Sequence, residues 1–333
     1  MSDELPLSSY TAFAKASDII ESLNPDVSLY TNLLSMSDED ESAYANIGKD
    51  FANYVKMFGN ATHRGGVAYD LYPLRRKVKQ SGILWNKQYD YESGNQYLDT
   101  YWLQNLELSA TTAKANDYEA GITLQSMGMK NNASKRRWTN PSSKADIGYQ
   151  VYTSLAYGMK TIQYFTYWES PVQNSDGEIY TQAMIEQKED GTVTETPIYG
   201  FVQSVNNEIT KFDHVFLDYD WQGTLYSGTD FIGVDTTYKT DKITLTSASQ
   251  NALVGCMKDT DKGFEGYWIV NAVEPQNTTA QANTVKVTFS GKTKALLYNP
   301  AAGIYGKLIN LASDGSYTAT LNLGEAQFII PIV

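Results

Sequence analysis

Residues 66–73 read GVAYDLYP, and residues 155–171 read LAYGMKTIQYFTYWESP. Each stretch contains a short apolar run that stops abruptly at polar and aromatic residues. A buried strand of a parallel α/β sheet has this pattern where its carboxyl end reaches a binding site. The pair therefore predicts two parallel strands, with Asp70 and Glu169 just beyond their apolar parts.

The first two thirds of the chain alternate between strand-like and helix-like patterns. Such alternation indicates a parallel sheet with right-handed crossovers. A complete barrel needs eight strand–helix units in about 250 residues, so four legible units predict half a barrel. We expect strands at 27–34, 66–73, 120–127 and 161–168 and helices at 8–23, 37–58, 97–115, 143–159 and 197–213, with loops at 75–96, 128–141 and 172–194.

The sequence pattern changes near residue 220 from alternating helix-like and strand-like segments to short strand-like runs. Eight short strand-like runs follow, separated by turn signals such as Asp314-Gly315. Regular short strands without helical periodicity predict an antiparallel β-sandwich. The expected fold is therefore α/β plus all-β, with a half barrel at 1–215 and a sandwich at 220–333.

Composition excludes several classes of function. The formal net charge of -12 argues against nucleic acid and anionic membranes as partners. The single cysteine, Cys256, cannot form an internal disulfide and leaves the compartment open, and the histidines His63 and His214 each stand alone, so we expect neither a metal site nor a cofactor. No apolar run approaches the ~18 residues of a membrane span, and the first residues lack the pattern of a signal peptide.

The YDLYP turn and the later AYG and YFTYW segments together resemble the β-galactosidase-like superfamily of (β/α)8 glycoside hydrolases. The similarity runs from residue 3 to the end and corresponds to the C-terminal half of the barrel plus the β-sandwich that follows it. It implies that Asp3-Glu4-Leu5-Pro6 is the turn after the fourth barrel strand. It also implies that carbohydrate is hydrolysed or bound at the carboxyl ends of the strands.

Glycoside hydrolysis needs two carboxyl groups, about 5 Å apart in retaining enzymes and roughly 6.5–9.5 Å apart in inverting ones. The resemblance places Glu4 where related families have the general acid/base. It places Gln125 near the usual nucleophile position, but an amide cannot act as the nucleophile. The second carboxylate is then Asp70 or Glu169. The alternatives are that Asp70 only accepts backbone hydrogen bonds in its turn and that Glu169 is a solvated loop residue.

The substrate-binding candidates are aromatic or polar residues near strand ends. Aromatic rings in such loops suit the flat apolar faces of sugars, an amide can bind a hydroxyl, and arginine can meet an acidic sugar. Buried core packing is the alternative for the rings, and a solvated loop is the alternative for Arg136 and Arg137. The candidates are Tyr72, Gln125, Arg136, Trp138, Tyr167 and Trp168.

Three hypotheses about function remain open at this level. The chain is a glycoside hydrolase, a carbohydrate-binding or interaction protein that has lost hydrolysis, or a fragment that needs a partner half. A four-stranded half barrel would leave strands 27–34 and 161–168 as open edges beside an apolar concave face. We therefore expect a homodimer that closes the barrel about a two-fold axis.

Overall fold

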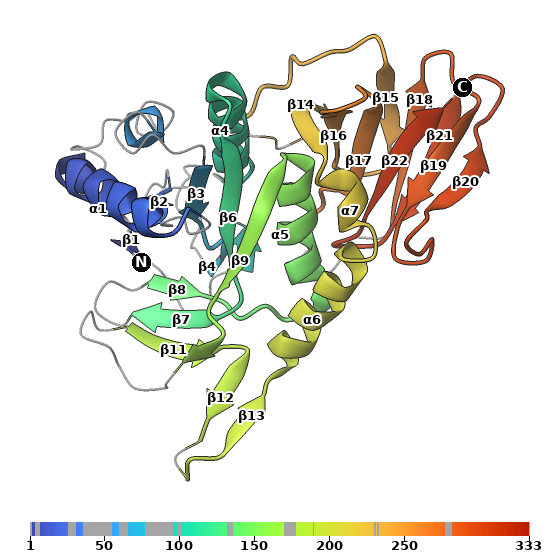
Figure 1. Cartoon of the computed structure of the whole chain (residues 1–333). Helices are drawn as coiled ribbons and strands as arrows, with labels where there is room; N and C mark the ends of the chain where they lie inside the picture. The colour runs from blue at the N-terminus through green and yellow to red at the C-terminus, as the bar shows by residue number, and fades with distance from the viewer. Residues whose placement is uncertain are drawn as a thin grey trace.

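A computed structural model shows mixed α/β architecture with several sheets (Figure 1). The described residues are 2–3, 7–25, 31–35, 55–59, 66–76, 96–98, 102–131, 136–169, 178–188, 190–229, 231, 233–276 and 282–332. Within them, no helix is both long and apolar enough to cross a membrane.

A five-stranded sheet lies in the N-terminal part. Its order is β1 (Ser2–Asp3), β2 (Thr31–Leu34), β3 (Gly66–Asp70), β6 (Glu119–Gln125) and β9 (Met159–Phe165), and every neighbouring pair is parallel. The expected count of four is thus wrong by one strand, because two residues are too few to show an apolar pattern. The end strands are β1 and β9 rather than β2 and β9, and they do not pair with each other in the described part.

The outer face of this sheet is apolar and covered by helices. Leu33, Tyr69, Ile122 and Leu124 are fully buried in the largest core, which they share with α4 (Trp102–Asn116) and α5 (Lys144–Ala156). The short helix η1 (Leu7–Ser9) leads into α1 (Tyr10–Leu23), whose Tyr10 and Phe13 pack on Phe58.

The inner face of the sheet carries small and polar residues. Neighbouring residues in register share a face, and the rows opposite the apolar side are Ala68–Gly121–Thr161 and Asp70–Thr123–Gln163. The Thr123 hydroxyl donates a hydrogen bond of 3.2 Å to Asn32 Oδ1 across β3. The prediction of an apolar concave face is therefore wrong. Successive side chains of a strand point to opposite faces, and the apolar side chains of these strands point toward the helices.

The segment 128–141, expected to be a loop, contains two strands. β7 (Gly128–Asn131) and β8 (Arg136–Trp138) belong to an antiparallel sheet with β11 (Glu178–Gln182), β4 (Leu74–Arg76) and β5 (Gln96–Leu98). A small core of Met127, Met129, Trp138 and Ala183 lies under it. Only two of these residues, Met129 and Trp138, lie in the basic, asparagine-rich stretch 128–141, which is too few to predict strands.

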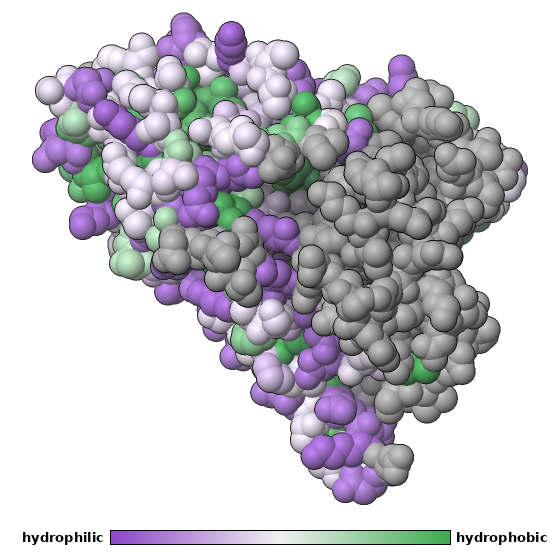
Figure 2. Space-filling model, turned by 180° about the vertical axis from the view of Figure 1, so that it is seen from behind, coloured by the Kyte–Doolittle hydropathy of each residue, from purple (hydrophilic) through white to green (hydrophobic). Residues whose placement is uncertain are grey.

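A third sheet combines β10 (Trp168–Glu169), β12 (Ile185–Gln187) and β13 (Val193–Glu195). The hairpin of β12 and β13 projects from the body and is covered mostly by hydrophilic residues (Figure 2). It leads into α6 (Pro197–Ile209), which Thr196 caps by accepting a hydrogen bond from the Ile198 N–H, and then into α7 (Asp213–Phe216).

The C-terminal part consists of two antiparallel sheets. Apolar residues of both sheets share one core that includes Val254, Ile269, Val287 and Leu321. All eight expected strand runs lie on observed strands, and one further strand, β14, precedes them. The first sheet is β14 (Tyr219–Ser227), β16 (Ala252–Asp259), β17 (Glu265–Asn271), β22 (Ala326–Ile332), β19 (Lys294–Tyr298) and β20 (Lys307–Asn310); the second is β15 (Ile243–Ala248), β18 (Asn283–Phe289) and β21 (Ser316–Leu321).

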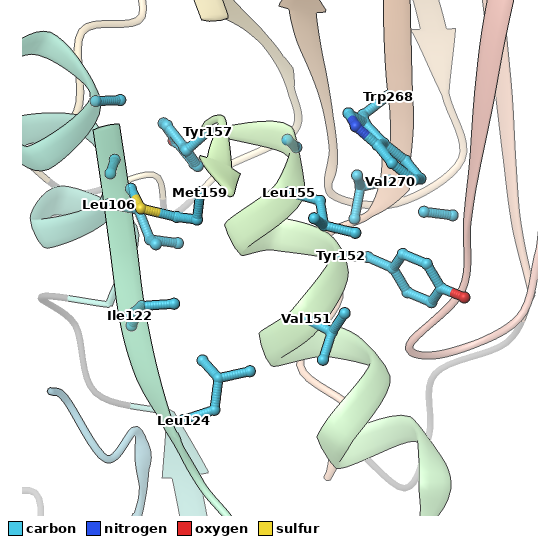
Figure 3. Close-up of a cluster of buried hydrophobic side chains, with 14 of the residues drawn as sticks. Leu106, Ile122, Leu124, Val151, Tyr152, Leu155, Tyr157, Met159, Trp268 and Val270 are labelled. Atoms are coloured by element: carbon cyan, nitrogen blue, oxygen red, sulfur yellow. The ribbon is translucent and has the colours of Figure 1, made fainter. Parts of the chain in front are cut away.

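Helix α5 joins the two parts. Figure 3 shows Ile122 and Leu124 of β6 on one side of the helix and Trp268 and Val270 of β17 on the other. The approach is close, since a Cβ on Gly148 would lie 2.2 Å from the Gly324 carbonyl oxygen. One core thus runs through both parts, and their division into domains at 1–215 and 220–333 stays a prediction.

Candidate functional site

Asp70 ends β3 at the carboxyl edge of the parallel sheet. It is partly exposed, and it stands in register with Leu34 of β2 and Thr123 of β6. This row belongs to the polar inner face. Asp70 is therefore positioned by the central strand of the sheet, on the face that the helices leave uncovered.

Three aromatic rings line the next layer beyond this edge. Tyr72 is half-buried and stacks on Phe165, the last residue of β9, with ring centroids 5.6 Å apart. Phe165 in turn contacts Tyr180 of β11 at 6.0 Å. Trp138 is only 7% exposed and packs in the core against which these three rings lie. Trp138 thus packs in the core under the antiparallel sheet, and only part of the Tyr72 ring is accessible to a ligand.

Tyr167 and Trp168 are exposed beyond the end of β9. Their exposed fractions are 58% and 45%, among the largest for apolar side chains in the described part of the chain. Their backbone is nevertheless tied down, because the Ile185 N–H donates to the Tyr167 carbonyl at 2.8 Å and Trp168 pairs with Ile185. Each of these two exposed rings therefore lies on a hydrogen-bonded backbone, and an exposed aromatic face suits a flat apolar partner.

Gln125 is fully buried and binds only protein atoms. Its Oε1 accepts a hydrogen bond from the Leu74 N–H at 2.8 Å, and its Nε2 donates to the carbonyls of Met127 and Thr139, each at 3.0 Å. These bonds fasten β4 and the chain on both sides of β7 and β8 to the end of β6. The Gln125 side chain therefore holds the carboxyl edge of the sheet together, and its hydrogen-bonding atoms are already used by the protein.

Some sequence candidates cannot be placed as side chains. Glu4 lies outside the described residues. For Arg136, Arg137 and Glu169 only the backbone is described, in β8 and β10, where Glu169 pairs with Glu186. The roles expected of these four side chains stay predictions.

One partly exposed residue of the inner face, Gln163, is not among the residues predicted from the sequence. Gln163 of β9 is half-exposed and stands in register with Thr123, one strand further from Asp70. The signal was available: in the run 161–165, Thr161, Gln163 and Phe165 alternate with Ile162 and Tyr164, which pack toward the core. A period-two reading of this strand would have assigned its polar face.

Comparisons with known proteins give a loose likeness of fold. No family model matches the sequence, and no curated protein matches it. Among solved structures, the chain is similar to a glycoside hydrolase at 10% identity, with a TM-score of 0.41 over 98% of this chain and 69% of that one. A glycoside hydrolase family 5 protein from Bacteroides vulgatus gives 12% identity and a TM-score of 0.41, covering 98% of this chain and 67% of that one.

An α-amylase from Geobacillus thermoleovorans gives 12% identity and a TM-score of 0.40, and the chain spans 58% of its length. Identities this low concern the arrangement of elements alone.

Proposed function

We propose that this chain is a glycoside hydrolase-like protein that acts on or binds carbohydrate at the carboxyl edge of its parallel strands. The observation that carries the proposal is that Tyr167 and Trp168 are exposed on a hydrogen-bonded backbone. Both residues follow β9 at the carboxyl edge of the parallel sheet, and Asp70 is the last residue of β3 at the same edge. In this proposal the parallel sheet is the second half of a (β/α)8 barrel, and the two antiparallel sheets are the β-sandwich that follows it.

Sugars suit both features of this surface. Their C–H faces bury apolar area against aromatic rings, and their hydroxyls need polar partners such as carboxylates and amides. Asp70 and Gln163, which are both partly exposed, supply such groups on the inner face. We propose Tyr167 and Trp168 as the stacking residues, with Tyr72 at the side and Arg136 as a polar contact.

Asp70 occupies the middle of the catalytic arrangement that we propose. It lies on β3; β2 separates β3 from β1, and β6 separates β3 from β9. Neighbouring strands are about 4.8 Å apart, so β1 and β9 each lie about 10 Å from β3. Glu4 follows β1 and Glu169 follows β9. Asp70 is thus the common member of either carboxylate pair, with Glu4 or Glu169 as its partner.

Hydrolysis of a panel of aryl-glycosides tests this proposal. Turnover should fall by at least about a hundredfold in Asp70→Asn, because general acid–base or nucleophilic help contributes roughly 10²–10⁴-fold. Glu4→Gln and Glu169→Gln, assayed separately, identify the partner. Unchanged turnover in all three variants, with the fold intact by circular dichroism, would overturn the catalytic part.

A second candidate is a carbohydrate-binding protein without hydrolysis. The buried amide of Gln125 favours it, because this residue stands at the strand end where the resembled family commonly places its nucleophile. Binding of an oligosaccharide that Trp168→Ala weakens, with no turnover of any aryl-glycoside, would decide for this candidate.

A further inference from the structure

A cavity of about 420 Å³ lies at the other end of the parallel sheet, where β6 and β9 begin. β6 has seven residues, which separate its two ends by about 20 Å. The cavity is therefore distinct from the carboxyl edge. Its wall consists of Ala110, Ala113, Lys114, Asp117, Tyr118, Glu119, Ala120, Tyr157, Gly158, Lys160, Asp220, Trp221, Gln222 and Thr260.

The cavity joins the two parts of the molecule. One side comes from the end of α4 and the start of β6, and the other comes from β14 and the turn after β16. Lys114 Nζ donates to the Gln222 carbonyl at 2.8 Å and lies 5.7 Å from the Trp221 ring centroid. Lys160 Nζ pairs with Asp220 Oδ1 at 2.8 Å. Both lysines thus bridge the wall and hold its sides together.

The shape of the wall is set by close contacts. Gly158 has φ of +77° and a Cβ there would lie 2.8 Å from Trp221 Cβ, so no larger residue fits. The Trp221 indole N–H donates to the Thr224 hydroxyl at 3.0 Å, which fixes the ring. Gly158 and the fixed indole define the inner part of the cavity, and the exposed side chains of Lys114, Asp117 and Glu119 lie around it.

Charge decides which ligands suit the site. Its ionisable wall contains three carboxylates, on Asp117, Glu119 and Asp220, and two ammonium groups, on Lys114 and Lys160. Both signs of charge lie in the wall, and Lys160 already pairs with Asp220, so a ligand of a single charge meets attraction and repulsion together. Both kinds of group bind hydroxyls well, as acceptors and as donors.

The rest of the wall mixes polar and apolar groups. Tyr118 and Trp221, which are both partly exposed, contribute carbon surface beside the charged groups, and Gln222 and Thr260 add further polar groups. A ligand that offers hydroxyls in several directions and C–H surface between them matches this wall. We propose that the cavity is a second binding site, for a neutral saccharide unit, that is separate from the carboxyl edge and takes no part in the reaction proposed there.

Nuclear magnetic resonance of the tryptophan indole N–H groups tests this site. The chain has 6 tryptophans, so the indole region is simple, and Trp221→Phe assigns the signal at the cavity. Maltose, cellobiose and xylobiose are titrated to millimolar concentration, with glucuronic acid and glucosamine as charged probes. At least one neutral disaccharide should shift the Trp221 signal, and the charged probes should leave it in place.

Variants separate this inference from the proposed function. Asp117→Asn and Glu119→Gln should weaken the effect at Trp221 roughly tenfold each, because each loses a charge-assisted hydrogen bond. Asparagine keeps the φ of +57° at position 117 accessible. Asp261→Asn, in an exposed turn outside the cavity, is the matched control and should change nothing.

The response at Trp221 should survive in Trp168→Ala, whatever that variant does to binding or turnover at the carboxyl edge. Loss of the Trp221 response in Trp168→Ala would overturn the inference, since it would assign one site to both signals. An unmoved Trp221 signal with every neutral disaccharide would overturn it as well, even where the aryl-glycoside assays support the proposed function.

Discussion

Gln125 Oε1 accepts a hydrogen bond from the Leu74 backbone N–H at 2.8 Å, across 51 residues of sequence. The same residue is held from the other side, since Gln150 of α5 donates to the Gln125 carbonyl at 3.1 Å and accepts from its N–H at 2.9 Å. The carboxyl end of β6 is thus locked between a helix and a small sheet by two glutamines.

Gln125→Leu should lower the free energy of unfolding by about 2–4 kcal/mol, because buried backbone groups at Leu74, Met127 and Thr139 lose their partner. Gln125→Glu should not create a nucleophile and should destabilise the fold as well, since its carboxylate would face backbone carbonyls. Urea denaturation measures both effects. The exposed Gln187→Leu is the control, and equal midpoints for it and Gln125→Leu would contradict the prediction.

Replacing Trp138 and replacing Trp168 by alanine should affect different properties, stability in the first case and carbohydrate binding in the second. Trp138→Ala should cost about 3–5 kcal/mol of stability, because a nearly buried ring leaves a cavity. Trp168→Ala should change stability by less than about 0.5 kcal/mol, because its ring is half-exposed. Its effect should appear instead as weaker retention on immobilised oligosaccharide. A Trp168→Ala variant that unfolds early but binds normally would refute this assignment.

The stability should carry a pH dependence from Glu107. Burial raises the pKa of this carboxyl above its ordinary value of 4.5, although the Asp235 N–H and the Tyr226 hydroxyl donate to it. The folded state therefore holds its proton to higher pH than the unfolded state does. The stabilising contribution is full below the unfolded pKa and is lost as the pH rises through the folded one.

Urea midpoints measured from pH about 4 to pH about 7 should fall more steeply in the parent protein than in Glu107→Gln, because the variant has no proton to lose there. Glu186→Gln, on the exposed hairpin, should leave the steeper slope in place. Parallel curves for the parent and Glu107→Gln would show that Glu107 contributes nothing to the slope.

Cys256 should resist alkylation in the native protein. It is buried in the core between the two antiparallel sheets, and burial raises the pKa of its thiol to about 12. A rise of about three pKa units leaves roughly a thousandfold less thiolate to react. Iodoacetamide should label the chain only in denaturant, as mass spectrometry can follow. Rapid labelling of the folded protein would place Cys256 at the surface.

A homodimer remains our prediction for the assembly. The sheet ends at β1 and β9, and in the described part neither strand has a second neighbour in that sheet. A second copy would pair with these strand edges by backbone hydrogen bonds. Light scattering should give about twice the 37.1 kDa chain mass. A monomer at micromolar concentration would rule the dimer out.

Local pattern was enough to determine most of the longer helices and strands and their order, but not the short strands β1, β7 and β8. The run 120–127 and the eight C-terminal runs form strands because apolar and β-branched residues recur there between turn residues. The helix predicted at 143–159 is observed with both ends within three residues of the prediction, and Ser143 and Asp146 form a capping box at its start. These signals act over a few residues, so a single sequence contains them.

Only the tertiary structure decided which side chains are buried at the site and which are offered to a ligand. Trp138 and Trp168 look equivalent in sequence, yet one packs on Met127 and Met129 while the other stands in solvent. Gln125 looked like a ligand contact and is a structural tie, because residues 51 positions earlier and 14 positions later fold over it. Burial depends on such distant partners, and no local pattern encodes where they meet.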